Sequence, residues 1–148
     1  MKKSIVALFV LALVGCGKET PKATEKPTVA VEPSLYAKVA SIDAGAKVAE
    51  DSSQTIRAKK SIQQAAVLCK LTEDDIAGKA VKVKSMLEEK KMSAQSVDVL
   101  EMIPLVFREK VNGDCNSILA RYVTVRDSGM NHAQATVGLN GLINAITK

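Results

Sequence analysis

Apolar residues recur at intervals of three and four along most of the stretch from residue 34 to residue 148. That spacing puts them on one face of an α-helix, whereas a half-buried strand would need strict alternation. Short valine-rich pieces, such as residues 81–83, fall inside longer helical patterns. The sequence therefore predicts an all-α fold, a compact bundle of five or six helices.

In the first half of this stretch, serine and threonine hydroxyls mark the expected helix starts. Ser34 should cap a helix whose inward residues are Leu35, Val39, Ile42, Ala46 and Ala49. Ser52 and Ser53 suggest a new start, with Ile56, Ile62, Ala66 and Cys69 inward, but one continuous helix remains an alternative. Thr72 and the acidic turn Glu73-Asp74-Asp75 predict a third helix, with its inward residues Ile76, Ala80, Val83 and Leu87.

The second half repeats this pattern. Ser93 is expected to cap a helix that Pro104 kinks and that Asn112-Gly113 ends, with Val97, Leu100, Ile103, Phe107 and Val111 inward. Asp114 should open a fifth helix, closed by Ser128-Gly129, with Cys115, Ile118, Leu119, Tyr122 and Val125 inward. Asn131 and Gln134 resemble a capping box for the last helix, whose inward residues are Ala135, Leu139, Leu142 and Ile146.

The N-terminus has a different character. Lys2 and Lys3 precede an apolar run over residues 5–14, which is too short to span a membrane and fits the core of a signal peptide. The run ends in Leu13-Val14-Gly15-Cys16, which resembles the lipobox of bacterial lipoproteins. The resemblance implies cleavage before Cys16 and lipid on that cysteine. An ordinary secretory signal with an incidental cysteine is the alternative.

The same resemblance implies a location and a domain organisation. In such lipoproteins an aspartate after the cysteine commonly retains the protein in the inner membrane, and Gly17 here implies the outer membrane, facing the periplasm. Residues 1–15 would be the signal peptide, 16–33 the lipidated N-terminus and flexible tether, and 34–148 the helical domain. Prolines 21, 27 and 33 keep the tether from forming a helix, and its extended reach is about 50 Å.

With Cys16 committed to lipid, Cys69 and Cys115 remain. Outside the cytoplasm such a pair is expected to form a disulfide, which would tie the end of the second helix to the start of the fifth. Two separate buried thiols are an alternative. A metal site that adds His132 is disfavoured, because the close ligand pairs of zinc motifs are absent from the sequence.

Composition argues against several classes of function. Loss of Lys2 and Lys3 with the signal lowers the formal charge from +5 to about +3, and no run of lysine or arginine exceeds two residues. A nucleic-acid partner is therefore not expected. Beyond residue 15 the aromatic residues are Tyr36, Phe107 and Tyr122, too few for the stacking platforms of sugar or single-strand sites.

Candidates for chemistry each have a structural interpretation that we prefer. His132, the only histidine, could be a general base or pH sensor, but a surface position near a cap is favoured. Glu73, Asp74 and Asp75 could act on a glycosidic bond, but helix capping is favoured. Gly138 and Gly141 resemble parts of phosphate loops, but close helix packing is favoured.

Two apolar features could serve either the core or a partner. Met86, Met92, Met102 and Met130 could line a binding groove, although core filling is preferred. Residues 97–107 are apolar on more than one face and are expected to form the central buried helix rather than an exposed docking face.

Together these features favour a non-enzymatic, membrane-tethered envelope protein, without a cofactor or metal, whose helical domain binds another envelope protein. The alternatives are an immunity or inhibitor protein against a periplasmic toxin or lytic enzyme, and a small-ligand carrier or chaperone. An enzyme acting on an envelope polymer ranks last.

Overall fold

Residues 32–107 and 114–146, which a computed structural model describes, form six helices and no strand. They pair into three consecutive helical hairpins. These are α1 (Leu35–Ala44) with α2 (Ser53–Cys69), α3 (Glu73–Glu89) with α4 (Ser96–Val106), and α6 (Cys115–Asp127) with α7 (His132–Ile146). The all-α prediction is confirmed.

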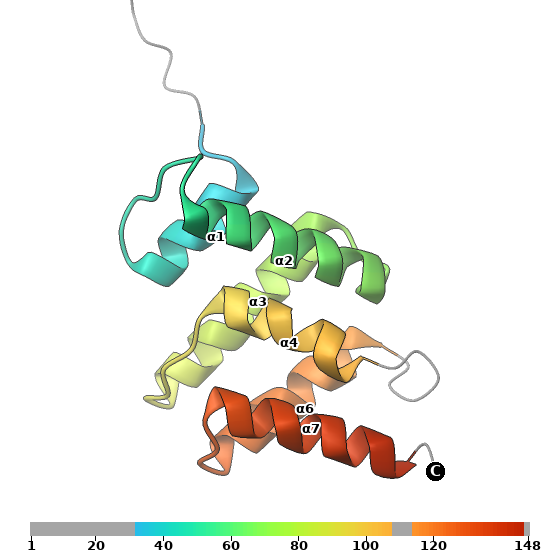
Figure 1. The fold of residues 1–148 in the computed structure, drawn as a ribbon. Coiled ribbons are helices and arrows are strands. Elements are labelled where there is room, and N and C mark those ends of the chain that lie inside the picture. The colour runs from blue at the N-terminus through green and yellow to red at the C-terminus, as the bar shows by residue number, and fades with distance from the viewer. Residues whose placement is uncertain (1–31, 108–113, 147–148) are drawn as a thin grey trace, which may run out of the picture. The chain divides into compact units, whose positions relative to one another are not determined.

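The hairpins stack so that successive helices alternate between two layers (Figure 1). One layer holds α1, α3 and α6, and the other holds α2, α4 and α7, with α4 packed between α2 and α7. The middle helix α4 contacts each of the other five described helices. Six of its apolar side chains are at most 4% exposed, namely Val97, Val99, Leu100, Met102, Ile103 and Val106, whereas Leu105 is 56% exposed. The prediction of a central buried helix over residues 97–107 is confirmed for residues 97–106, apart from Leu105.

Local capping explains most of the helix starts. Ser34, Ser52, Thr72 and Asp114 each accept a hydrogen bond from a backbone N–H three residues on. Asn131 and Gln134 form the predicted reciprocal pair, at 3.0 and 2.9 Å. Gly45, with φ of 66°, ends α1 in the left-handed conformation that glycine adopts without strain, so the first two helices are separate.

The predicted start of the fourth helix is wrong. The N-cap is Gln95, not Ser93, and the Gln95 side chain makes no capping bond. Asp43, at the end of α1, caps α4 instead: its two carboxylate oxygens accept from the backbone N–H groups of Ser96 and Val97 at 2.7 and 2.9 Å. The helix also ends early, at Val106, with Pro104 in its last turn, and Val111 lies outside the described residues.

Several apolar residues expected to face inward are exposed. Ile42, Ile56 and Leu142 are 45%, 61% and 56% exposed. Ala46 and Ala49 are exposed because α1 has already ended at Ala44. The inward positions of α3 are all as predicted, with Ile76, Ala80, Val83 and Leu87 buried. The side chain of Ile146 lies outside the described residues.

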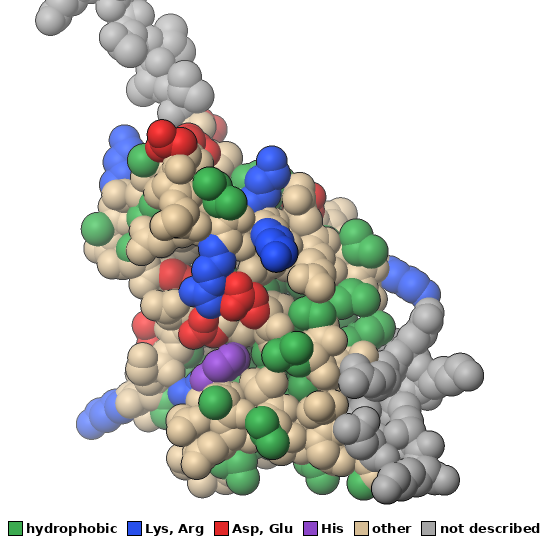
Figure 2. Space-filling view, in the orientation of Figure 1, with side chains coloured by type: hydrophobic (Ala, Val, Ile, Leu, Met, Phe, Trp, Pro, Cys, Tyr) green, Lys and Arg blue, Asp and Glu red, His purple; other side chains and the backbone are tan. Residues whose placement is uncertain are grey.

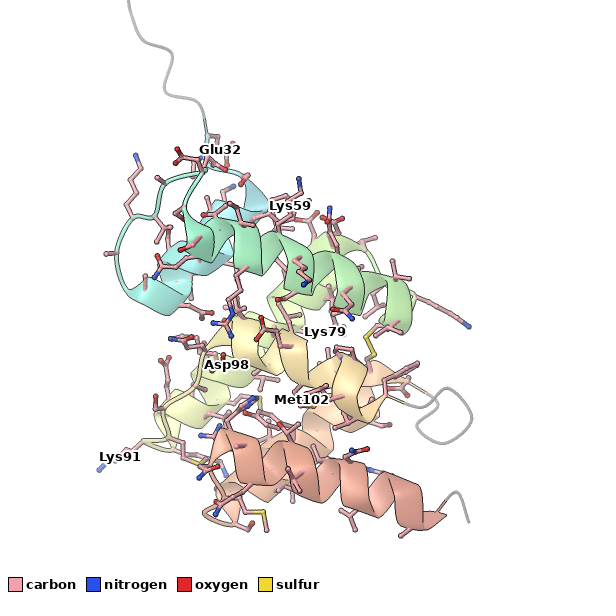
Figure 3. The ribbon with its side chains drawn as sticks, in the orientation of Figure 1. Glu32, Lys59, Lys79, Lys91, Asp98 and Met102 are labelled. Carbon is pink, nitrogen blue, oxygen red and sulfur yellow. A yellow bond between two sulfur atoms is a disulfide. The ribbon has the colours of Figure 1, made fainter. Side chains whose placement is uncertain are left out.

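A disulfide joins Cys69, at the end of α2, to Cys115, at the start of α6, with 5.5 Å between the Cα atoms. The sulfur–sulfur bond is drawn in yellow in Figure 3. It ties the first hairpin directly to the last one, as predicted. Cys16, the predicted signal peptide and nearly all of the tether fall within residues 1–31 and so outside the described residues. In the described ranges, no helix is both long and apolar enough to cross a membrane.

Candidate functional site

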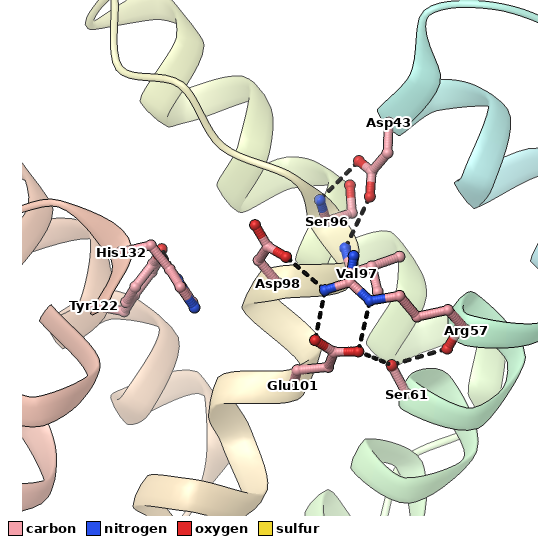
Figure 4. A network of polar contacts seen from close by, with 9 residues as sticks. All are labelled: Asp43, Arg57, Ser61, Ser96, Val97, Asp98, Glu101, Tyr122 and His132. Atoms are coloured by element: carbon pink, nitrogen blue, oxygen red, sulfur yellow. Dashed lines mark hydrogen bonds and ion pairs between the residues drawn. The ribbon is translucent and has the colours of Figure 1, made fainter. Parts of the chain in front are cut away.

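Polar side chains gather on both sides of the middle helix α4, which carries Asp98 and Glu101 outward (Figure 4). On one side lies Arg57 of α2. Its Nε and Nη2 donate to the two oxygens of Glu101 at 2.8 and 2.6 Å, and Nη2 also donates to Asp98 at 2.7 Å. Paired charges of this geometry hold two helices in register. Arg57 therefore has a sufficient structural role.

This ion-pair cluster also changes the titration of its members. Arg57, with Ser61 assisting, keeps the pKa of the Glu101 carboxyl below its usual value by hydrogen bonding to the charged form. Hydrogen bonds to the two carboxylates raise the pKa of Arg57. Both groups stay charged at neutral pH, which suits a structural ion pair.

On the other side of α4, three polar side chains form a chain of hydrogen bonds. Arg126 of α6 donates from Nη1 to the hydroxyl oxygen of Tyr122 at 2.9 Å, and that hydroxyl lies 2.9 Å from Nδ1 of His132. Because the hydroxyl oxygen accepts from Arg126, its proton is free to be donated to Nδ1. That arrangement leaves the Nε2 proton of neutral His132 available as a donor.

Arg126 and Tyr122 are almost completely enclosed, at 6% and 1% exposed. Burial raises the pKa of the Tyr122 hydroxyl, so it stays protonated at neutral pH. Arg126 also donates from Nη2 to the carbonyl oxygen of Ser93 at 2.7 Å, which fixes the loop before α4 to α6. The Nε atom of Arg126 is buried without a hydrogen-bond partner.

A hollow of about 380 Å³ opens beside this chain, between the start of α4, the end of α6 and the start of α7. Apart from Ala94, the residues that line it have polar side chains: Ser93, Gln95, Asp98, Tyr122, Arg126, Asn131 and His132. Figure 2 shows the histidine in purple on this face, next to acidic side chains in red. The volume of the hollow falls in the range of small-molecule sites, and we therefore take the hollow as the candidate binding site.

The other predicted chemical residues have structural roles in this fold. Thr72 accepts from the backbone N–H of Asp75 and donates to its carboxylate, so the favoured capping interpretation fits. Glu73 accepts a hydrogen bond of 2.5 Å from the hydroxyl of Tyr36 and thereby links α3 to α1. His132 does lie at the start of α7, but it is half-buried and hydrogen-bonded rather than a free surface residue.

Close packing does not explain Gly138 and Gly141. A Cβ at Gly141 would meet nothing within 4 Å, and one at Gly138 would meet only the sulfur of Met130, at 4.0 Å. Core filling holds for Met102, which is fully buried, and partly for Met92. It is wrong for Met86 and Met130, which are 39% and 42% exposed.

Among the six described helices, α7 alone carries no charged residue. The helix contains no lysine, arginine, aspartate or glutamate over its 15 residues. Val137 and Leu142 are 72% and 56% exposed on it, and Gly141 lies between them. We call the exposed residues Val137, Gly141 and Leu142 the α7 outer face.

Within residues 32–107 and 114–146, no group of three or more histidine, cysteine, aspartate or glutamate side chains could hold a metal ion. Comparisons with protein-family models, with curated proteins and with solved structures found no match. The function is therefore inferred from the residues and the geometry alone.

Proposed function

We propose that the chain is a non-enzymatic lipoprotein of the cell envelope. It is held to the outer membrane by lipid on Cys16, and its helical domain faces the periplasm and binds another protein. The anchor is supported by the order of its parts, which are two lysines, a short apolar run and Leu13-Val14-Gly15-Cys16. Lipoproteins carry two or three acyl chains, and two or more are enough for stable attachment. Palmitate is a typical member of such a set.

The protein-binding part rests on one observation, the uncharged α7 outer face. A soluble helix normally presents charged residues opposite its buried face. Here α7 exposes Val137 and Leu142 and carries no charged residue. Exposed apolar surface next to polar side chains is typical of interaction sites. Ala135 and Leu139 of α7 belong to the buried core, which holds this helix in place and so lowers the entropic cost of binding.

Site-specific photo-crosslinking in intact cells tests this proposal. A photoreactive residue at Val137 should give a discrete crosslinked species with an envelope protein. The matched control is Val67, a valine of α2 that is 78% exposed but lies on a helix that carries Arg57, Lys59 and Lys60. Crosslinks from both positions to the same products, or from neither, would refute binding at the α7 outer face.

A further inference from the structure

Arg126 is a charged group beside α4 whose burial the fold does not account for. The side chain is 6% exposed, yet none of the carboxylates among the described residues forms an ion pair with it. Its hydrogen-bond partners among the described residues are neutral, a tyrosine hydroxyl and a backbone carbonyl. Buried cations are normally paired with an anion, because removal of an unpaired charge from water is costly.

The position of Arg126 directs that unbalanced charge to the hollow. Its two partners, Tyr122 and Ser93, both line the hollow, as does Arg126 itself. Its Nε is buried and has no partner among the described residues, so they leave the hydrogen bonding of the guanidinium incomplete. An anionic group in the hollow would neutralise the charge. Arginine suits a carboxylate in particular, because its N–H groups match the two oxygens.

A negative group lies at the same hollow. Asp98 accepts from Arg57 through Oδ1 only, and Oδ2 has no partner among the described residues. The hollow thus presents a cation and a carboxylate oxygen to one ligand, together with the Nε2 proton of His132 and the side chains of Gln95 and Asn131. A purely anionic ligand would use Arg126 but would be repelled by Asp98. A ligand with both charges uses both.

We propose that this hollow binds a small zwitterion of the α-amino acid class, with its carboxylate at Arg126 and its ammonium group at Asp98. This site is separate from the α7 outer face, because Val137, Gly141 and Leu142 are not among the residues that line the hollow. Failure of one proposal leaves the other intact, because the crosslinking experiment does not involve the residues of the hollow.

The test is a titration of the isotope-labelled full chain in detergent micelles, followed by NMR. The probes are L-alanine, N-acetyl-L-alanine, which lacks the ammonium group, and L-alanine amide, which lacks the carboxylate. We expect saturable shifts with L-alanine at the amides of residues 93–98 and 131–134. Each analogue should bind about tenfold or more weakly, because it lacks one charge-assisted interaction.

Two variants assign the charges. Arg126→Gln should abolish or weaken L-alanine binding by at least about tenfold, while Arg121→Gln, an exposed arginine on the same helix, should leave it unchanged. Asp98→Asn should weaken L-alanine but not N-acetyl-L-alanine, and this variant decides the question if Arg126→Gln fails to fold. Absence of saturation with L-alanine, equal binding of its amide, or an unaffected Asp98→Asn protein would overturn the proposal.

Discussion

Arg57 and Arg126 lie on opposite sides of the same helix, and their surroundings differ in a way that separates structure from function. Arg57 is 45% exposed in its side chain and engages two carboxylates of α4. Arg126 is nearly enclosed and engages neutral groups only. The positive charge of Arg57 is therefore balanced by side chains of the protein. The positive charge of Arg126 is left for a ligand to balance.

The comparison extends to the hairpins that carry the two arginines. The first hairpin is joined to the middle one by charged contacts, through Arg57 and through Asp43 at the start of α4. The last hairpin meets the middle one through the apolar core, through the hydrogen bond from Arg126 to the loop before α4, and through an exposed ion pair between Lys90 and Asp127. The disulfide links the two arginine-bearing helices, α2 and α6, directly. The charge of Arg57 is thus paired within the protein, whereas Arg126 pairs with no carboxylate of the described residues.

The largest expected effect comes from removal of the disulfide, which should weaken the packing of the first and the last hairpin against the middle one. Cys69→Ser with Cys115→Ser should lower the free energy of unfolding by about 4 kcal/mol, on the loop-entropy argument for a separation of 46 residues. Urea unfolding measures it, with Cys16→Ser as the control that leaves the pair intact. A loss below about 1 kcal/mol would show that the bridge adds little to the stacked core.

The next effect concerns the contact between the first hairpin and the start of α4. Asp43→Ala should cost about 2 kcal/mol, because it leaves two N–H groups at the buried start of α4 without a partner. Asp51→Ala, at an exposed acidic residue of the loop before α2, should change stability by less than about 0.5 kcal/mol. Equal effects of the two variants in thermal unfolding would rule out the capping role of Asp43.

Salt dependence compares the two arginines directly. Arg57→Met should cost about 1 kcal/mol at low salt and less at high salt, because the ion pairs are partly exposed and screened. Arg126→Met should leave the salt dependence of unfolding as it is in the unaltered protein. The distinction between the two arginines would fail if the free energy of unfolding of both variants depended on salt in the same way.

A smaller effect concerns acid. The folded-state pKa of Glu101 is depressed, mainly by the hydrogen bonds from Arg57, so its contribution is present above the unfolded value, about 4.3, and is lost as pH falls below it. Glu101→Gln should therefore flatten the decline of stability below about pH 4.3, by less than about 1 kcal/mol. Chemical unfolding at several pH values measures this. If the free energy of unfolding of the variant fell below about pH 4.3 as steeply as that of the unaltered protein, this coupling would be contradicted.

The smallest effect tests the exposed apolar residues. Ile56→Ala should alter the free energy of unfolding by no more than about 0.5 kcal/mol, since this side chain is 61% exposed. Leu100→Ala, in the buried centre of α4, is the contrasting case and should cost about 3 kcal/mol. A large loss at Ile56 would show that the residue is covered in solution.

The sequence predicts the fold where the cause is local. Thr72, Asp114 and Asn131 cap the helices that directly follow them, so their roles could be read from neighbouring residues. The cap of α4 could not be predicted in this way, because Asp43 precedes Ser96 by 53 positions. The interpretation of Gly138 and Gly141 as sites of close helix packing was also wrong, since a Cβ at either position would meet no other helix of the described residues within 4 Å.

The candidate site was missed for a related reason. An arginine in a helix is normally solvated, and the residues directly beside Arg126 in the sequence do not indicate that it is buried. One signal was available: Arg126 follows Tyr122 by four positions and therefore shares the inward face of Ile118 and Leu119. His132 was singled out, but its partner Tyr122 was expected only as a core residue.

The central claim is that the helical domain is tethered to a membrane through Cys16, and metabolic labelling with palmitate tests it most directly. The unaltered protein should carry the label and, after processing, begin at a lipid-modified Cys16 by mass spectrometry, whereas Cys16→Ser should carry none. An unlabelled protein, or one whose mature N-terminus is Met1, would contradict the anchor and with it the envelope setting of the proposed partner.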